Sequence, residues 1–182
     1  DTVTLKINGM TVTAPKGATI LEAARLAGID IPTLCFLKEI NEIGACRICV
    51  VEVKGARSLV ASCVYPVNEG MEVFTNTPKV LEFEKDIAAY SLQPQQKMSL
   101  LRTQQTLLAS AALQDLGVES EDIYDGEKNE YELDMSAAHM VRDNNKCILC
   151  RRCMAVCEKV QGVGVIGANE RGFKTEISSA FG

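Results

Sequence analysis

A segment of 29 residues near the start of the chain holds four of its eight cysteines. It runs from Cys35 to Cys63 and reads CFLKEINEIGACRICVVEVKGARSLVASC. Cys46 and Cys49 form a C-x2-C pair, which on a tight loop lets two thiolates converge on one metal centre. Gly44 beside the pair lets the backbone approach without a Cβ clash. Because only a fold can bring Cys35 and Cys63 to that pair, we interpret the four cysteines as one site.

The spacing of these cysteines favours a 2Fe–2S cluster. The plant-type pattern is C-x4-C-x2-C followed by a distant cysteine, and this chain differs only in a first gap of ten residues. A four-cysteine zinc site and unmetallated thiols remain alternatives. Zinc sites usually pair two short cysteine knuckles, and the first half of this chain has one.

The residues around the site predict a small α+β domain. Asn8-Gly9 separates two alternating segments and is a strong hairpin signal. Thr19 and Glu22 match a helix capping box, and Gly28 stands where a helix C-terminal cap is expected. Further strands are expected at Val50 to Val53, Leu59 to Ala61 and Met71 to Thr75. Together they predict a β-grasp ferredoxin-like domain over residues 1–78.

A second cysteine motif predicts a 4Fe–4S cluster. Cys147, Cys150, Cys153 and Cys157 form the bacterial run C-x2-C-x2-C-x3-C, with Glu158 where proline usually follows. In two-cluster ferredoxins the fourth cysteine of such a run serves the other cluster, which makes Cys157 a doubtful ligand here. We expect a partial, apparently truncated 4Fe–4S ferredoxin-type domain over residues 138–182. Either Cys157 bends back to complete its cubane, or the cluster is labile or externally completed, and we favour the second outcome.

These motifs resemble the N-terminal iron–sulfur relay region of iron-only (FeFe) hydrogenases of the NAD(P)-linked and electron-bifurcating type. The large iron–sulfur subunit of respiratory complex I shares the first domain. The resemblance is strong over residues 1–78 and 138–175 and poor over 84–112. In those families the middle region binds a further cluster through one histidine and three cysteines. Here the matching positions hold Met98, Arg102, Gln105 and Ala111.

None of those four side chains can replace an iron ligand, so we expect no cluster between Met98 and Ala111. Residues 79–137 are instead expected to form a helical segment and an acidic linker, either natural or engineered. An alternative interpretation of the acidic stretch is a docking surface for a basic partner. His139, the only histidine, lacks a partner at metal-ligand spacing and is expected to have a surface or packing role.

The charge, hydropathy and cysteine content of the chain exclude several classes of function. The net charge of −5 gives no support for nucleic-acid binding. No apolar run approaches the roughly 20 residues that span a bilayer, and no signal peptide is visible. Closely spaced C-x2-C units without a secretion signal favour metal over disulfides. We therefore expect a cytoplasmic iron–sulfur protein, and its first residue, Asp1, suggests a fragment of a longer subunit.

The resemblance implies an electron relay between a flavin–NAD(P)H partner and a hydrogen-activating site, with ferredoxin as a further candidate partner. The chain itself shows no residues for a catalytic H-cluster and no nucleotide fingerprint, so no catalytic residues are assigned. One alternative is the equivalent relay region of a complex I-like or formate dehydrogenase-linked subunit. A second is a non-redox, metal-stabilised interaction module, which iron and sulfide content would distinguish.

Overall fold

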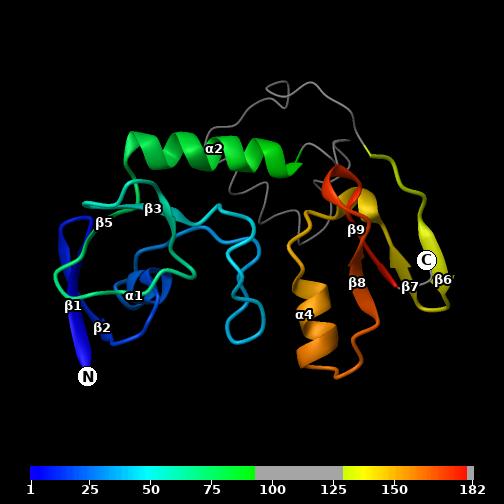
Figure 1. Ribbon diagram of the computed structural model, residues 1–182, viewed down its shortest axis with the longest axis horizontal. Coiled ribbons are helices and arrows are strands. Elements are labelled where there is room, and N and C mark those ends of the chain that lie inside the picture. Colours follow the sequence, from blue (N-terminus) through cyan, green and yellow to red (C-terminus); the bar gives the residue numbers. More distant parts are fainter. Residues whose placement is uncertain (93–128, 180–182) are drawn as a thin grey trace. The chain divides into compact units, whose positions relative to one another are not determined.

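The computed structural model describes residues 1–92 and 129–179, and these divide into two compact units. The first unit comprises residues 1–36 and 42–87, and the second includes residues 37–41 as well as the C-terminal part of the chain. Figure 1 shows the elements of each unit. The expected helical leucine-rich segment and the region from Met98 to Ala111 lie outside the described residues.

The first unit is built on a five-stranded mixed sheet with the order β2-β1-β5-β3-β4. Strands β1 (Thr2–Ile7) and β5 (Glu72–Phe74) are parallel, and the other neighbours are antiparallel. The remaining strands are β2 (Met10–Pro15), β3 (Val50–Val53) and β4 (Val60–Ala61). The expected strands are thus confirmed, although β4 and β5 are shorter than predicted. The result is the α+β, 2Fe–2S ferredoxin-like fold predicted from the sequence.

Local signals in the sequence set the first hairpin and helix. Asn8 and Gly9 both have positive φ, which a two-residue turn needs to match the strand twist, and Ile7 pairs with Met10 across it. Helix α1 (Ile20–Leu26) begins with the predicted capping box between Thr19 and Glu22. It ends with Gly28 at φ +72°, where the absence of a Cβ avoids strain.

The core of the first unit lies between the sheet and α1, where alternating strand residues meet one face of the helix. Its fully buried members include Leu5, Ile7, Ile20, Leu21 and Val51. Helix α2 (Pro78–Leu92) follows β5. Val80 and Glu84 on this helix are both buried, while Glu82 between them is exposed. A carboxyl group therefore occupies a position four residues after a core residue, where an apolar side chain would be expected.

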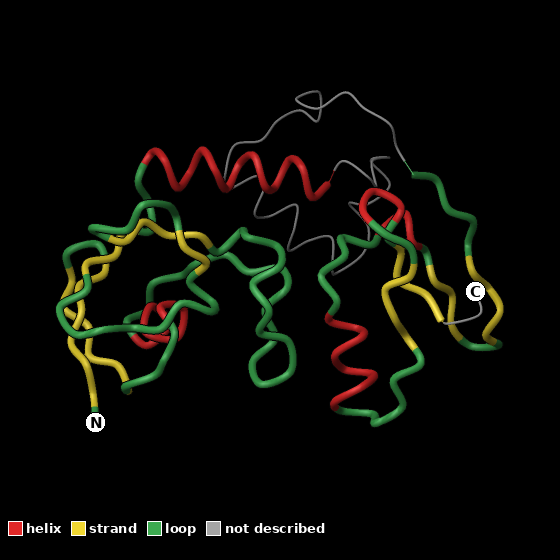
Figure 2. Tube along the Cα trace, in the orientation of Figure 1, coloured by secondary structure: helices red, strands yellow, loops and turns green. Residues whose placement is uncertain are grey.

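The second unit contains two antiparallel strand pairs, a short helix and two 3-10 turns (Figure 2). Its elements are β6 (Asp134–Ala137), β7 (Met140–Arg142), η3 (Asn144–Lys146), α4 (Arg152–Lys159), β8 (Ile166–Asn169), η4 (Gly172–Lys174) and β9 (Glu176–Ser179). His139 is exposed in the turn between β6 and β7, as expected for a surface residue. Residues 129–133 precede β6 without regular secondary structure.

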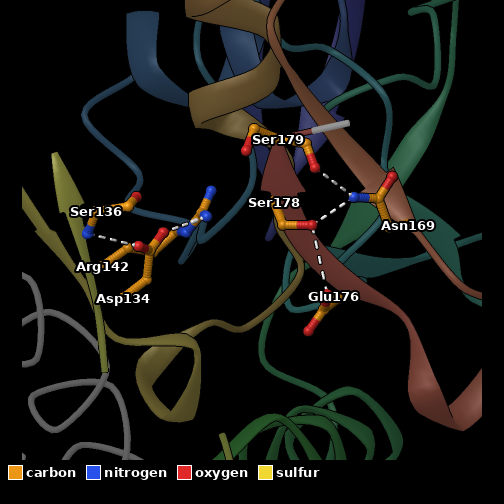
Figure 3. Close-up of polar contacts among 7 residues, drawn as sticks. All are labelled: Asp134, Ser136, Arg142, Asn169, Glu176, Ser178 and Ser179. Atoms are coloured by element: carbon orange, nitrogen blue, oxygen red, sulfur yellow. Dashed lines mark hydrogen bonds and ion pairs between the residues drawn. The ribbon is translucent and has the colours of Figure 1, made fainter. Parts of the chain in front are cut away.

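Polar contacts fix both strand pairs of the second unit (Figure 3). Arg142 on β7 forms an ion pair with Asp134 on β6, and Asp134 also accepts a hydrogen bond from the Ser136 backbone at 3.0 Å. On the other pair, the Asn169 amide donates to the Ser178 hydroxyl and to the Ser179 carbonyl. These contacts supply cross-strand stabilisation that such short pairs need.

Residues 37–41 join the second unit through their backbone and one side chain. The Asn41 amide Nδ2 donates to the Cys150 carbonyl at 3.0 Å, and Lys159 Nζ donates to the Ile40 carbonyl at 2.7 Å. Asn41 is only 3% exposed. The ten-residue gap between Cys35 and Cys46 therefore contains a segment that is held against the second cysteine motif.

Candidate iron–sulfur sites

The four cysteines of the first unit are brought together as two pairs. The side chains of Cys35 and Cys46 share a hydrogen bond, and so do those of Cys49 and Cys63. The negative charges of Cys35, Cys46 and Cys49 all reach the Cys63 thiol. Cys35, Cys49 and Cys63 are at most 1% exposed, and Cys46 is partly buried. The fold thus gathers the predicted residues into one water-poor site.

Each pair holds one thiolate-like and one thiol-like sulfur. The hydrogen bond from Cys35 lowers the pKa of Cys46 to about 5, and the bond from Cys63 lowers the pKa of Cys49 to about 7. The same bonds, together with burial, raise the pKa values of Cys35 and Cys63. Because a metal ligand must be a thiolate, the remaining proton of each pair would leave when metal binds.

Backbone groups of the cysteine loop point at the sulfur atoms. The Cys46 N–H donates to the Cys35 sulfur at 3.4 Å, and the Ile48 N–H lowers the pKa of Cys46. Arg47 adopts a left-handed conformation with φ +61° between the two cysteines of the pair. Such a conformation turns successive N–H groups toward an anion, which compensates for the strain of a non-glycine residue at positive φ.

Gly44 has the structural role that the sequence predicted. Its φ is +59°, and a Cβ there would lie 3.2 Å from Cγ2 of Val64, just after Cys63. The loop before Cys46 therefore passes close to the segment that carries the last cysteine, which a larger residue would obstruct.

The arrangement of the four thiols in two pairs can supply the ligands of a two-iron cluster. Within residues 1–92 and 129–179, no three histidine, cysteine or acidic side chains gather around a common position for one metal ion. A structural zinc ion needs four ligands around one centre, whereas two thiol pairs provide two ligands for each of two irons. The donor set and its burial thus fit a 2Fe–2S cluster.

The second cysteine motif is more open. Cys147, Cys150 and Cys153 are near one another, since the negative charges of the last two raise the pKa of Cys147, although burial contributes more. Cys147 and Cys150 are partly exposed and Cys153 is exposed. The Leu149 N–H donates to the Cys147 sulfur at 3.4 Å. Leu149 and Arg151 both have positive φ, so this loop repeats the left-handed conformation that Arg47 adopts in the first site.

Cys157 has a different environment from the other three cysteines. It lies on α4 with Cys153, as the spacing predicted, but is buried. The backbone N–H of Ile166 lowers its pKa most, followed by those of Val165 and Gly164, despite an opposing effect of burial. Its sulfur therefore lies in a separate group of N–H donors, before and at the start of β8.

Sequence reasoning missed three residues near the cysteines. Asn41 binds the Cys150 backbone. Ser62 is fully buried beside Cys63, and Glu84 is buried within electrostatic reach of Cys49. Burial and the negative charge of Cys49 raise the pKa of Glu84 to about 7. The long first gap was the single sequence signal for Asn41. Nothing local distinguishes Ser62 or Glu84 from surface residues.

The fold and the paired thiols define a ferredoxin-like 2Fe–2S domain. Residues 1–78 match the family model described as a 2Fe-2S iron-sulfur cluster binding domain. The same residues lie within the stretch that is similar to an NADP-reducing hydrogenase subunit and to an NADH-ubiquinone oxidoreductase 75 kDa subunit. The chain accordingly resembles the iron–sulfur relay regions of those subunits.

Three comparisons support this placement. The chain is 39% identical to the NADP-reducing hydrogenase subunit HndD of Solidesulfovibrio fructosivorans, over 98% of this chain and 32% of that protein. It is 33% identical to the NADH-ubiquinone oxidoreductase 75 kDa subunit of Reclinomonas americana, over 97% and 26% respectively. A crystal structure of an NAD⁺-reducing NiFe-hydrogenase matches with a TM-score of 0.86 and 25% identity, over 98% of this chain and 75% of that one.

The chain therefore spans about a third or less of the length of these two curated relatives. The relatives include hydrogenases and respiratory enzymes, so the finer assignment to iron-only hydrogenases does not follow from likeness alone. No helix within the described residues is both long and apolar enough to cross a membrane.

Proposed function

We propose that this chain relays electrons between a flavin–NAD(P)H partner and the hydrogen-activating site of an iron-only hydrogenase. The observation that carries the proposal is the pairing of Cys35 with Cys46 and of Cys49 with Cys63 in one buried site. A 2Fe–2S cluster bound there would accept and donate one electron at a time.

The chain's own residues determine how that site behaves. Each hydrogen-bonded pair would hold one iron through two thiolates. Burial of three of the four cysteines excludes water from their sulfur atoms, which would limit hydrolysis of the iron–thiolate bonds and oxidation of the thiolates. The N–H groups around Cys46 and Cys35 compensate the negative charge of the ligands.

A 4Fe–4S cluster is proposed at Cys147, Cys150 and Cys153. Their mutual electrostatic contact and the Leu149 N–H donor support it. We propose a cubane that is labile or completed from outside these residues instead of one completed by Cys157, because in two-cluster ferredoxins the fourth cysteine of such a run serves another cluster.

The identity of the partners is proposed from the relatives. Identity to the NADP-reducing hydrogenase subunit is higher, at 39%, than to the complex I subunit, at 33%, which supports the hydrogenase reading. The proposed location is the cytoplasm. The equivalent relay region of a complex I-like or formate dehydrogenase-linked subunit is the second candidate. The two share the same modules, so their partners distinguish them.

The cofactor proposal is tested by anaerobic reconstitution of the chain with ferrous iron and sulfide. We expect bound iron and acid-labile sulfide, visible absorption that bleaches on reduction, and a rhombic paramagnetic signal from the reduced first site. A colourless protein that takes up zinc and retains no sulfide would overturn the proposal and support the interaction module.

The partner proposal needs a separate experiment. A tagged copy of the full subunit in its native host should co-purify with a flavin-containing, NAD(P)H-oxidising subunit and with hydrogen-oxidising activity. Co-purification with quinone-reducing or formate-oxidising activity would instead support the second candidate.

A further inference from the structure

Ser62 is a fully buried polar residue whose hydroxyl lacks a hydrogen-bond partner. The residue is 0% exposed, and its Oγ makes no hydrogen bond of ordinary geometry within the described part of the chain. An unsatisfied buried hydroxyl is unfavourable, and native proteins contain few of them. A small apolar residue would fill the same space without that penalty, so the hydroxyl needs an explanation.

The backbone fixes the position of Ser62. Its N–H donates to the Cys49 carbonyl at 3.0 Å, and its own carbonyl accepts from the Leu21 N–H at 3.0 Å. Ser62 also comes directly after β4 and directly before Cys63. It is therefore held between two ligand positions and the first turn of α1, and its hydroxyl cannot turn to solvent without breaking these contacts.

The backbone hydrogen bond to the Cys49 carbonyl holds Ser62 beside Cys49. The pKa of Cys49 falls chiefly through the hydrogen bond from Cys63, and the Ser62 hydroxyl adds to this lowering. The hydroxyl lies outside ordinary hydrogen-bond geometry, yet close enough to favour the Cys49 thiolate. A thiol is a weak acceptor and a thiolate is a stronger one, so the hydroxyl gains a partner when Cys49 is deprotonated to bind metal.

We propose that Ser62 is a positioning residue that donates its hydroxyl hydrogen bond to the Cys49 thiolate and thereby raises the reduction potential of the first site. This inference rests on the proposed 2Fe–2S function. Reduction adds negative charge that the ligand sulfurs share. A donor in a water-poor site stabilises that charge more in the reduced state than in the oxidised state.

The test compares three forms of the full chain, each reconstituted with iron and sulfide: unmodified, Ser62→Ala and Ser62→Thr. We expect Ser62→Ala to keep its 2Fe–2S signal but to lower the reduced-to-oxidised ratio at a given potential about tenfold, or about 59 mV for one electron. Ser62→Thr keeps the hydroxyl and should restore the unmodified potential. Ser178→Ala, which removes a buried hydroxyl from the second unit, should leave the first site's potential unchanged.

A Ser62→Ala potential equal to the unmodified one, or a Ser62→Thr potential as low as that of Ser62→Ala, would overturn the inference. If Ser62→Ala does not assemble the cluster, the unmodified chain labelled with Cβ-deuterated serine decides the matter. Electron–nuclear double resonance of the reduced first site should then show deuterium coupling from one nearby serine, and its absence would refute the proposal. Failure of the unmodified chain to assemble a cluster would instead refute the proposed function.

Discussion

The two cysteine motifs share a left-handed backbone conformation, but the cysteines of the first are mostly buried and those of the second are more exposed. Both place left-handed residues between closely spaced cysteines, Arg47 in the first and Leu149 and Arg151 in the second. The first motif then buries its sulfurs in hydrogen-bonded pairs, while the second leaves Cys153 exposed. Loop geometry alone therefore organises ligands, whereas the surrounding core determines how well they are protected from water.

The largest expected effect comes from removing one ligand of each motif. Cys49→Ser should abolish or strongly alter the rhombic signal of the reduced first site and leave the second unaffected. Cys150→Ser should do the reverse. Paramagnetic resonance of the two variants measures both sites in one sample, and an unchanged rhombic signal in Cys49→Ser would remove the ligand assignment.

Oxidative stability should differ between the two sites because their burial differs. We expect iron to leave the second site on the order of tenfold faster than the first under mild oxidation, since solvent reaches its sulfurs. Iron release during a timed ferricyanide treatment, with both signals followed, measures the order of loss. Equal rates, or earlier loss from the buried site, would contradict the comparison.

Glu84 should make the folding stability of the chain depend on pH. Its folded pKa of about 7 lies above the ordinary value of 4.5 for a glutamate, so the native state binds more protons than the unfolded state between these values. Stability should therefore fall as pH rises through this window, by about 2–3 kcal/mol. Urea unfolding at pH 5 and pH 8 should show this loss in the unmodified chain.

The Glu84→Gln variant should show a much smaller difference between pH 5 and pH 8. Glu82→Gln, at an exposed position on the same helix, is the matched control and should behave like the unmodified chain. An equal pH dependence in Glu84→Gln and Glu82→Gln would show that burial of Glu84 does not set the effect.

Gly44 tests the close packing of the first site. Alanine at Gly44 would combine a positive φ with a Cβ 3.2 Å from Val64, and should destabilise the chain by about 2 kcal/mol. Gly55→Ala also has a positive φ but meets no neighbour within 4 Å, and should destabilise it by about 1 kcal/mol. Urea unfolding of both variants separates strain from crowding, and equal losses would argue against close packing.

The smallest expected effect concerns Cys157. Because the fourth cysteine of such a run serves another cluster in two-cluster ferredoxins, Cys157→Ala should leave the cubane spectrum largely intact. Cys153→Ala serves as the control that should lose it. Loss of the cubane in a folded Cys157→Ala chain would identify Cys157 as the fourth ligand.

The parts of the fold that the sequence predicted depend on local chemistry. The Asn8-Gly9 turn and the Thr19–Glu22 capping box involve residues at most three apart, and both are present as expected. The C-x2-C pair at Cys46 and the run from Cys147 to Cys157 are also local patterns, whereas Cys35 and Cys63 reach the first site only through the fold. The cluster ligands themselves remain a prediction until iron is measured.

The residues that the sequence did not reveal act over long separations. Asn41 contacts Cys150 across 109 residues, and no periodicity reports such a contact. Glu84 lies at a core position of its helix, but its side chain is charged. Its sequence therefore predicts an exposed residue. The sequence does not show that Ser62 is buried beside Cys49, because the fold alone determines this.

Because residues 37–41 belong to the second unit, they limit how the protein can be divided. A cut after Ile87 would release the first unit with Asn41 and Ile40 separated from Cys150 and Lys159. The excised module would carry a loop without its partners, directly beside Cys35, and the remaining fragment would lose a hydrogen bond to its own cysteine loop. Modular engineering of this relay therefore requires grafting the loop with the second unit or redesigning it, because no single cut separates the two units cleanly.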